Sequence, residues 1–364
     1  MARIDAFLKL GRDQGCTDIH LAVGLPPLLR NLGDLHPVKY RELTNQEIES
    51  LIFEILNEDL ANKFRSGKDL DFAYESNEVG RFRVSLYKKV TGIGAAFRLI
   101  PQLIPSLDDL GLPPAAKQLL VADNGLILVT GTTGTGKSTT LASMLDLLNR
   151  TRRLNIITLE DPIEHIYQSQ KSLIVQREVG IHVENFAVGL RAALREDPDV
   201  IMVGELRDPE TVMMAMTAAE TGHLVLGTLH TTSAAKSLDR IIDATPTELK
   251  AQTTNFLAQH LRGVISQKLV KSTDGRSRKA IVEIFINTPA IANLINSGKI
   301  FQIPSIMQTG KNKGMQLMDQ ALLEALQKNE IDPDDAYVHA TEKKMFQRFV
   351  TNPDLLPQVE LAVT

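Results

Sequence analysis

Residues 126–138 read Leu-Ile-Leu-Val-Thr-Gly-Thr-Thr-Gly-Thr-Gly-Lys-Ser, an apolar run followed at once by a glycine-rich stretch. The stretch from Gly131 to Ser138 matches the phosphate-binding pattern G-x-x-x-x-G-K-[ST], and the run before it predicts a buried strand. A helical stretch follows it, at 137–150. In this context the glycines let backbone N–H groups face phosphate oxygens, and the start of the helix adds partial positive charge. The sequence therefore predicts a nucleoside triphosphate site, with a glycine-rich turn as the alternative.

Each polar residue of this loop has an expected role. Lys137 is expected to contact the β- and γ-phosphates of ATP, and Ser138 to hold Mg²⁺ through its hydroxyl. The residues of the loop and the first turn after it that we expect to bind nucleotide are Gly131, Thr132, Thr133, Gly134, Thr135, Gly136, Lys137, Ser138 and Thr139.

Beyond the loop, apolar runs alternate with helical stretches, which is typical of a parallel α/β sheet. The predicted strands are 126–130, 155–159, 200–203 and 224–228, and the predicted helices are 137–150, 184–194, 209–220 and 234–243. Strand-like segments at 263–270 and 279–286 extend the sheet, with Asp274 and Gly275 at the turn between them. The pattern from residue 288 onward is helical.

The first hundred residues follow a different pattern. Apolar and polar residues alternate between 69 and 99, which predicts antiparallel strands, and Thr44 is a candidate N-cap for a helix through about residue 57. Four prolines between 101 and 114 favour a semi-rigid linker. The expected organisation is a small α+β domain (1–100), a hinge linker (101–114), an α/β P-loop core (115–287) and a helical C-terminal region (288–364).

Composition excludes several classes of protein. The chain has 364 residues, 43% of them hydrophobic, and its 44 acidic and 40 basic side chains give a net charge of −4. Apolar content of this level excludes disorder as the main state. Cys16 is the single cysteine, so we expect no internal disulfide and no cysteine-rich zinc site. No apolar run approaches the length that spans a bilayer, and we expect a soluble, cytoplasmic protein.

Hydrolysis of a nucleotide needs carboxylates near the metal and the attacking water. Glu160 begins the acidic segment Glu160-Asp-Pro-Ile-Glu164 after one predicted strand, and Glu205 follows another. Parallel sheets place their sites at the carboxyl ends of the strands. Glu205 is the preferred residue to orient or deprotonate the attacking water, and Glu160 is the alternative. Either carboxylate is expected to lie near Mg²⁺. The sequence alone does not distinguish between the two.

Histidines and arginines complete the candidate site. His230 follows the strand predicted at 224–228 and can report whether a γ-phosphate is present, and His223 precedes that strand. Glu164 and His223 join the residues expected to bind nucleotide. Transferring phosphoryl groups are commonly stabilised by an arginine supplied in trans. The arginine candidates of the first domain are Arg81, Arg83 and Arg98.

Several of these segments together resemble the secretion ATPase superfamily of type II and type IV pilus systems. They are the phosphate loop, Glu160–Glu164, the strand ending in Gly204-Glu205, and Gly222-His223 with His230, in the order and spacing of that superfamily. Over nearly its whole length the chain is similar to the PilT-type retraction ATPases. Further matching segments are Thr17-Asp-Ile-His-Leu21, Gly80-Arg-Phe-Arg-Val84, Gln302-Ile-Pro-Ser305 and Gly314-Met315.

The resemblance implies a PAS-like N-terminal domain and a RecA-like core, assembled as a homo-hexameric ring. Nucleotide would lie between the two domains, and the arginines would reach it when they close. ATP hydrolysis would drive an inner-membrane platform protein of the pilus machinery and retract the pilus, which places the protein at the inner membrane. The cofactors implied are ATP and Mg²⁺, without zinc, and no nucleic acid is expected as a partner.

One segment departs from the PilT pattern Ala-Ile-Arg-Asn-Leu-Ile-Arg-Glu-Gly, which is tied to retraction. This chain has Ala290-Ile-Ala-Asn-Leu-Ile-Asn-Ser-Gly298, so both arginines and the acid are absent while the apolar positions remain. We expect the packing to survive and a charged contact to be lost. One alternative to a retraction motor is an accessory PilT paralogue with weak turnover. Another is a nucleic-acid motor, which the negative net charge and the lack of tryptophan for base stacking disfavour.

Overall fold

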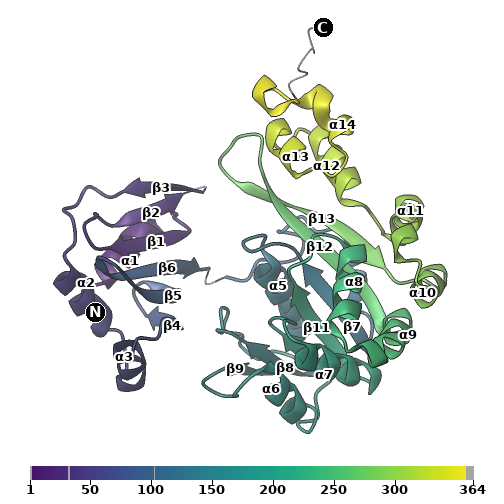
Figure 1. The fold of residues 1–364 in the computed structure, drawn as a ribbon, viewed down its shortest axis with the longest axis horizontal. Helices are drawn as coiled ribbons and strands as arrows, with labels where there is room; N and C mark the ends of the chain where they lie inside the picture. Colours follow the sequence, from purple (N-terminus) through teal and green to yellow (C-terminus); the bar gives the residue numbers. More distant parts are fainter. Residues whose placement is uncertain (1, 32, 102, 358–364) are drawn as a thin grey trace. The chain divides into compact units, whose positions relative to one another are not determined.

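The structure, a computed structural model, describes residues 2–31, 33–101 and 103–357, and it contains two compact units (Figure 1). Unit 1 comprises the described residues up to 104 together with 162–166. Unit 2 comprises residues 105–161 and the described residues from 167 onward.

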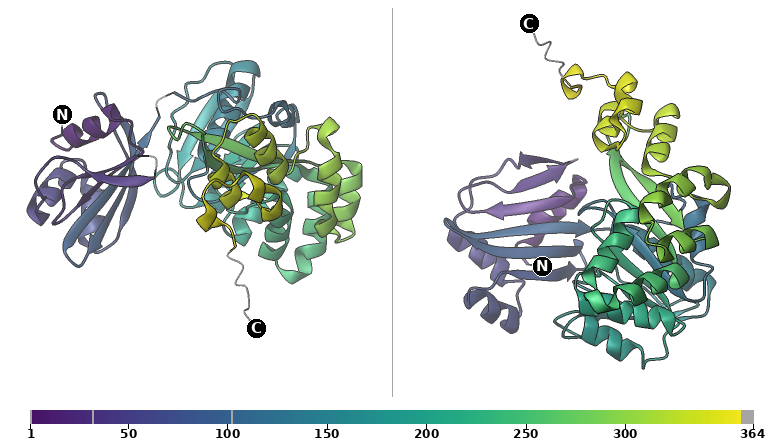
Figure 2. Two further views of the ribbon diagram at one scale, coloured as in Figure 1. Left: turned by 90° about the horizontal axis from the view of Figure 1, so that it is seen from above. Right: turned by 45° about the vertical axis from the view of Figure 1, so that its right-hand side comes forward.

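Unit 1 is one antiparallel sheet with three helices. The right-hand view of Figure 2 shows its strands side by side, in the order β3-β2-β1-β6-β5-β4. The strands are β1 (Asp18–Ala22), β2 (Leu28–Asn31), β3 (Asp34–Pro37), β4 (Leu70–Ser76), β5 (Gly80–Lys89) and β6 (Gly92–Ile100). The helices are α1 (Asp5–Asp13), α2 (Asn45–Phe53) and α3 (Glu58–Arg65).

Alternation along the strands of unit 1 produces one core. Phe82, Val84 and Leu86 of β5 are buried, and they pack in the same cluster as apolar residues of all three helices. The residues that alternate with them, Arg81, Arg83 and Ser85, share the other face of the sheet. The predicted cap of α2 is confirmed, because the Thr44 hydroxyl accepts from the Glu47 N–H and the Glu47 carboxylate accepts from the Thr44 N–H.

Unit 2 is built on a seven-stranded sheet in the order β13-β12-β7-β11-β10-β8-β9. All neighbouring strands are parallel except β12 and β13, which form a hairpin. The strands are β7 (Gly125–Thr130), β8 (Asn155–Glu160), β9 (Leu173–Glu178), β10 (Val200–Val203), β11 (Leu224–Leu229), β12 (Leu261–Lys271) and β13 (Arg278–Ile286). The predicted parallel α/β sheet is thus confirmed.

Strands of unit 2 are buried on both faces, so their apolar residues divide between two cores. On β7, Leu126 and Leu128 belong to a core with α6 to α11, whereas Ile127 and Val129 belong to a core with α4 and α5 (Figure 1). The helices are α4 (Pro114–Leu119), α5 (Lys137–Thr151), α6 (Phe186–Ala193), α7 (Pro209–Glu220), α8 (Ala234–Ala244), α9 (Lys250–His260), α10 (Pro289–Asn296) and α11 (Ile303–Thr309).

The β12–β13 hairpin carries the last helices. Its pairing continues to Lys271 and Arg278, whereas β12 pairs with β7 only as far as Ser266. Val270 and Ile281 of this projecting part pack with the C-terminal helices in a separate core. Those helices are α12 (Met318–Gln327), α13 (Pro333–His339) and α14 (Lys343–Phe346).

Five α-helices and strands of the described residues were not predicted from the sequence. They are the strands β3 and β9 and the helices α3, α4 and α9. Strand β9 lies at the sheet edge with Leu173 exposed, so it lacks the continuous apolar run that marks the buried strands. Among the described residues, no helix has the length and apolar character needed to cross a membrane.

Candidate functional site

The sheet order brings four candidate groups to one edge of unit 2. Strands β7, β11, β10 and β8 are successive neighbours and run parallel. The phosphate loop follows β7, His230 follows β11, Glu205 lies just past β10, and Glu160 ends β8. Because parallel strands end at the same edge, these groups stand in that order along it.

The loop between β7 and α5 owes its shape to three glycines. Gly131, Gly134 and Gly136 have φ angles of 147°, 79° and 87°, values that other residues rarely adopt. Gly136 is also the N-cap of α5, so the first N–H groups of a fifteen-residue helix open onto the loop. A helix start of this kind favours a bound anion such as phosphate.

Lys137 is held by its own loop. Its ammonium donates to the carbonyl oxygens of Gly131 at 2.8 Å and Thr132 at 2.9 Å. Burial lowers the pKa of Lys137, and the nearby negative charge of Glu205 opposes that shift. The two residues lie at the same edge of the sheet, because Lys137 follows β7 and Glu205 follows β10.

Glu205 stands between a histidine and an arginine. One carboxylate oxygen lies 2.9 Å from His230 Nε2, and the other lies 2.6 Å from Arg207 Nε. The Glu205 side chain is only 17% exposed. The adjacent turn is fixed by the Thr228 hydroxyl, which donates to the Gly204 carbonyl. The structure therefore brings Glu205 and His230 into direct contact.

Glu160 is buried, with 8% of its surface exposed. One of its oxygens accepts from the Thr158 hydroxyl at 2.6 Å and from the Gln176 amide at 3.1 Å. The side-chain oxygen of Gln176, Oε1, in turn accepts from the Tyr167 backbone N–H at 2.9 Å. The groups that orient the Glu160 carboxylate thus include a neutral donor on β8 and another on β9.

The three predicted arginines lie on the sheet of unit 1. Arg81 donates from Nη2 to the Ile163 carbonyl at 2.9 Å, and Arg83 forms ion pairs with Asp71 and, at 3.5 Å, with Glu164. Arg98 pairs with Asp18 at 2.9 Å. Glu164 lies in the 162–166 segment of unit 1, where it contacts Arg83. Contact of these arginines and of Glu164 with nucleotide stays a prediction.

The structure does not bring His223 to the phosphate loop. His223 directly precedes β11, so it lies at the amino edge of the sheet, whereas the loop follows the carboxyl end of the neighbouring strand β7. Six residues of strand separate the two edges by roughly 20 Å. There the His223 ring bonds the Ala218 carbonyl at 2.8 Å, closing the end of α7.

Three residues at this edge were not assigned a role from the sequence. Arg207 contacts Glu205, Gln176 contacts Glu160, and Gln267 of β12 donates to the Thr135 carbonyl of the loop at 2.7 Å. Gln176 and Gln267 lie on strands that lead to no recognisable motif. Their role depends on which strands are neighbours, and a local pattern carries no signal of that.

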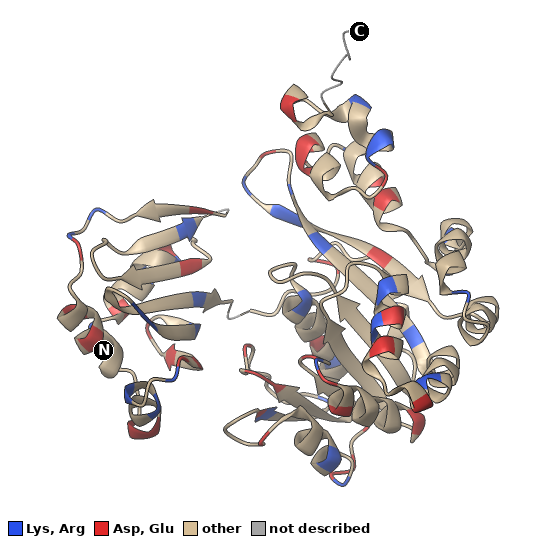
Figure 3. Ribbon diagram, in the orientation of Figure 1, with Lys and Arg blue, Asp and Glu red and all other residues tan. Residues whose placement is uncertain are grey.

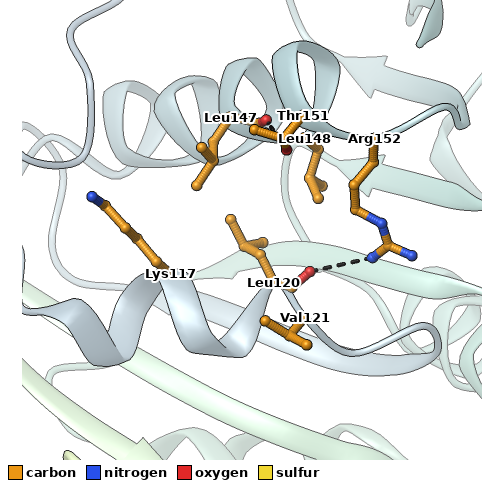
Figure 4. A pocket seen from close by; sticks show the side chains of 7 residues that line it. All are labelled: Lys117, Leu120, Val121, Leu147, Leu148, Thr151 and Arg152. Carbon is orange, nitrogen blue, oxygen red and sulfur yellow. Dashed lines mark hydrogen bonds between the residues drawn. The ribbon is translucent and has the colours of Figure 1, made fainter. Parts of the chain in front are cut away.

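A hollow of about 260 Å³ lies between α4 and the last turns of α5 (Figure 4). It is lined by Lys117, Leu120, Val121, Leu147, Leu148, Thr151 and Arg152. Arg152 bonds the Leu120 carbonyl across it. The phosphate loop is at the other end of α5, about 22 Å away along fifteen residues of helix, so this hollow is separate from the site.

Oxygen ligands suited to Mg²⁺ are present at the edge. The Ser138 hydroxyl is in the first turn of α5, Glu160 ends β8, and Glu205 lies just past the neighbouring strand β10. Mg²⁺ prefers such hard ligands and usually keeps several waters, so one hydroxyl and one or two nearby carboxylates fit it. In the part of the chain that the structure describes, no group of three or more His, Cys, Asp or Glu is arranged to hold a metal ion.

Known proteins resemble this chain over most of its length. The family described as "Type II/IV secretion system protein" matches residues 57–356. A type IV pilus retraction ATPase, PilT of Pseudomonas aeruginosa, is 46% identical over 333 residues, which cover 92% of this chain and 96% of that protein. The type IV pilus ATPase PilU of the same organism is 38% identical over 336 residues, covering 92% and 88%.

Among solved structures, the fold resembles that of the pilus retraction motor PilT with bound ADP. The TM-score is 0.85 at 41% sequence identity, and the match covers 96% of this chain and 99% of the other. The architecture predicted from the sequence, with a P-loop core, a smaller α+β domain and C-terminal helices, is that of this relative.

Proposed function

The chain belongs to the type II/IV secretion system protein family, and from that premise we propose that it is an ATP-driven motor for retraction of type IV pili. It is an ATPase of this family. The observation that carries the proposal is the contact of Glu205 with His230 beside the phosphate loop, at one edge of the sheet. Similarity to PilT over nearly the full length of both proteins supports retraction as the work that hydrolysis performs.

The residues of the edge divide the chemistry between them. Lys137 and the N–H groups of the loop bind the phosphates of ATP, and Ser138 would hold Mg²⁺ with Glu160 or Glu205 nearby. The chemistry supplied there would be neutralisation of charge on the transferring phosphoryl group. Glu205 orients the attacking water or accepts its proton. His230 holds one oxygen of Glu205, so it senses a change at the γ-phosphate through that contact.

We propose the same roles for the remaining candidates that the resemblance implied. Arg81, Arg83 and Arg98 stabilise the transferring phosphoryl group when the two units close or a neighbouring copy approaches. The active assembly is a ring of six copies, which acts on an inner-membrane platform protein of the pilus machinery. The protein then works at the cytoplasmic face of the inner membrane, with no zinc and no nucleic acid as a partner.

An accessory paralogue with weak turnover is the second candidate, and the α10 helix favours it. Ile291 and Ile295 of α10 are fully buried, so the packing expected from the sequence is confirmed. Asn296 and Ser297, which stand where PilT-type ATPases carry charge, are exposed. The departure from the retraction segment therefore changes a surface and leaves the core intact.

The test is steady-state ATP hydrolysis by the purified chain, together with its mass in solution with nucleotide. We expect a hexamer whose kcat falls by about 100-fold or more in Glu205→Gln while ATP binding persists. Glu248→Gln, at an exposed carboxylate in the short helical turn Thr247–Leu249 after α8, is the matched control and should behave as wild type does.

Two results would change the proposal. If Glu205→Gln hydrolyses ATP normally and Glu160→Gln does not, the role of base moves to Glu160. If the wild-type chain binds ATP in a ring with almost no turnover, the accessory paralogue replaces the motor.

A further inference from the structure

Gln267 is a buried amide directly beneath the phosphate loop. Strand β12 pairs with β7, and Ser266 lies opposite Thr130, the last residue before the loop. The next residue, Gln267, is only 3% exposed, so its amide must find partners inside the protein. Neither motif nor family resemblance pointed to this position.

Both ends of that amide are bonded. The Nε2 group donates to the Thr135 carbonyl of the loop at 2.7 Å, and Oε1 accepts from the Thr140 hydroxyl of α5 at 2.7 Å. A carbonyl can only accept, so the NH₂ group must face Thr135 and the oxygen must face Thr140. The orientation of the amide is therefore fixed by its surroundings.

The loop also packs against Gln267. A Cβ atom added at Gly131 would lie 2.5 Å from the Gln267 carbonyl oxygen, and one added at Gly136 would lie 2.8 Å from Nε2. Two glycines of the motif thus serve a close approach to this residue as well as a left-handed backbone.

Holding one carbonyl fixes the direction of the next N–H. The peptide between Thr135 and Gly136 is planar and trans, so its C=O and N–H point in opposite directions. Because the Thr135 carbonyl is bonded to Gln267 of β12, the Gly136 N–H is directed away from β12 and is free of that contact.

We propose that Gln267 is a positioning residue for nucleotide binding: it orients the Thr135–Gly136 peptide so that the loop N–H groups are set for phosphate before the nucleotide arrives. This assignment rests on the proposed nucleotide site, but it does not require hydrolysis. Substituting Gln267 should therefore weaken ADP and ATP binding and raise KM, with a smaller effect on kcat.

The test compares Gln267→Met, Thr140→Val and the double variant. Methionine has a similar shape without the donor, and valine replaces threonine without the hydroxyl. Replacing both partners of the buried Gln267–Thr140 hydrogen bond by apolar groups of similar shape leaves neither of them unpaired, whereas replacing one partner does. The Thr135 carbonyl still lacks its donor in the double variant, so only the stability lost at Thr140 is regained. The double variant therefore separates loss of stability from loss of loop orientation.

Binding is measured by titration with a fluorescent ADP analogue, and stability by urea unfolding without nucleotide. We expect the Kd to rise about 10- to 100-fold in Gln267→Met and to stay raised in the double variant, while the unfolding midpoint of the double variant returns toward wild type. Thr140→Ser, which keeps the hydroxyl, is the control and should stay within about twofold of wild type.

Wild-type affinity in Gln267→Met would overturn the assignment, and so would affinity that recovers together with stability in the double variant. A wild-type chain that binds ADP without hydrolysing ATP would contradict the proposed motor, but the role of Gln267 could still be tested by binding. ATP hydrolysis thus tests the proposed function, and nucleotide affinity tests the role of Gln267.

Discussion

Lys137 shows how a single charge is prepared for its ligand. Its ammonium is partly buried and contacts two carbonyl groups of the loop, with Glu205 as the nearby negative charge. Phosphate oxygens carry full negative charge, so they offer this ammonium stronger partners than neutral carbonyls do. The same side chain therefore organises the loop and binds the phosphates.

Lys137→Ala should abolish tight ATP binding, with a loss of affinity of about 100-fold or more, because a buried charge-assisted contact to phosphate is removed. Titration with a fluorescent ATP analogue measures the loss. Lys250→Ala removes an exposed lysine paired with Asp243 at the start of α9 and should bind as wild type does. Equal affinities for the two variants would show that the loop does not bind phosphate through Lys137.

At the scale of elements, the β12–β13 hairpin connects the edge of the site with the C-terminal helices. On β13, Glu283 is buried, and its two oxygens accept from the first N–H of α8, at Ala234 (2.7 Å), and from that of α12, at Met318 (3.4 Å). Helix α8 follows the segment that begins with His230. One carboxylate therefore fixes both the start of α8 and the start of the C-terminal helices.

Glu283→Ala should destabilise the chain by about 2–4 kcal/mol, because two helix starts lose an acceptor and a small cavity remains. The free energy of urea unfolding measures it. Glu330→Ala removes a surface carboxylate paired with Lys279 and should change that free energy by less than about 1 kcal/mol. An equal effect in both variants would mean that Glu283 contributes no more than a surface charge.

The same carboxylate predicts a pH dependence. Burial raises the pKa of Glu283 above its usual 4.5, and the negative charge of Asp319 adds to this shift. The two N–H donors and the positive charge of Lys268 lower the pKa of Glu283, but they do not outweigh burial. The folded chain therefore holds this proton more tightly than the unfolded chain, so stability falls as the pH rises from about 4.5 through the raised pKa. We therefore expect the unfolding free energy of wild type to fall over this pH range relative to that of Glu283→Gln, as measured by urea unfolding at several pH values. A difference between the two proteins that stays constant with pH would contradict the prediction.

Helix α10 leads to a prediction about pilus retraction rather than about ATP hydrolysis. Its exposed side carries Asn296 and Ser297 in place of charged residues of the retraction segment, and Ala292 is half-buried. The variant Ala292→Arg, Asn296→Arg, Ser297→Glu leaves the two fully buried residues of α10, Ile291 and Ile295, unchanged. In a strain lacking its retraction ATPase, we expect it to raise pilus retraction above wild type while ATP turnover of the purified protein stays within about twofold.

At the scale of the whole molecule, basic and acidic residues alternate along the same helices and strands. Figure 3 shows both colours along α8, which carries Lys236, Asp239, Arg240 and Asp243. The face of the unit 1 sheet that bears Arg81 and Arg83 is rich in arginine, with acidic residues among them. The strand register places Arg83 beside Arg98, and Asp18 beside both Arg98 and Arg30. Phosphate would compete with Asp71 and Asp18 for the guanidinium groups of Arg83 and Arg98.

If these arginines act on the transferring phosphoryl group, replacing Arg81, Arg83 and Arg98 together by alanine should lower kcat by about 100- to 1,000-fold in the assembled ring. The expected fall in nucleotide affinity is smaller, since the loop still binds the phosphates. Arg30→Ala, on the same face of the sheet, is the control. Unchanged hydrolysis in the triple variant would remove the arginines from the mechanism.

Much of this architecture was determined by the sequence itself. The apolar run before Gly131, the glycine pattern and the lysine that follows it predict strand, loop and helix within fifteen residues, and the structure confirms them. The four buried parallel strands were predicted for the same reason, since a strand buried on both faces reads as a continuous apolar run. Local patterns suffice where the forces that act are local.

Only the tertiary structure decided which residues meet at the loop. Gln267 and Thr135 are 132 positions apart, and they touch because β12 lies beside β7 in the sheet. The same order sends His223 to the opposite edge, while contacts with Arg81 and Arg83 join residues 162–166 to unit 1. Strand order is set by how apolar faces pack over the whole unit, and no stretch of sequence encodes that by itself.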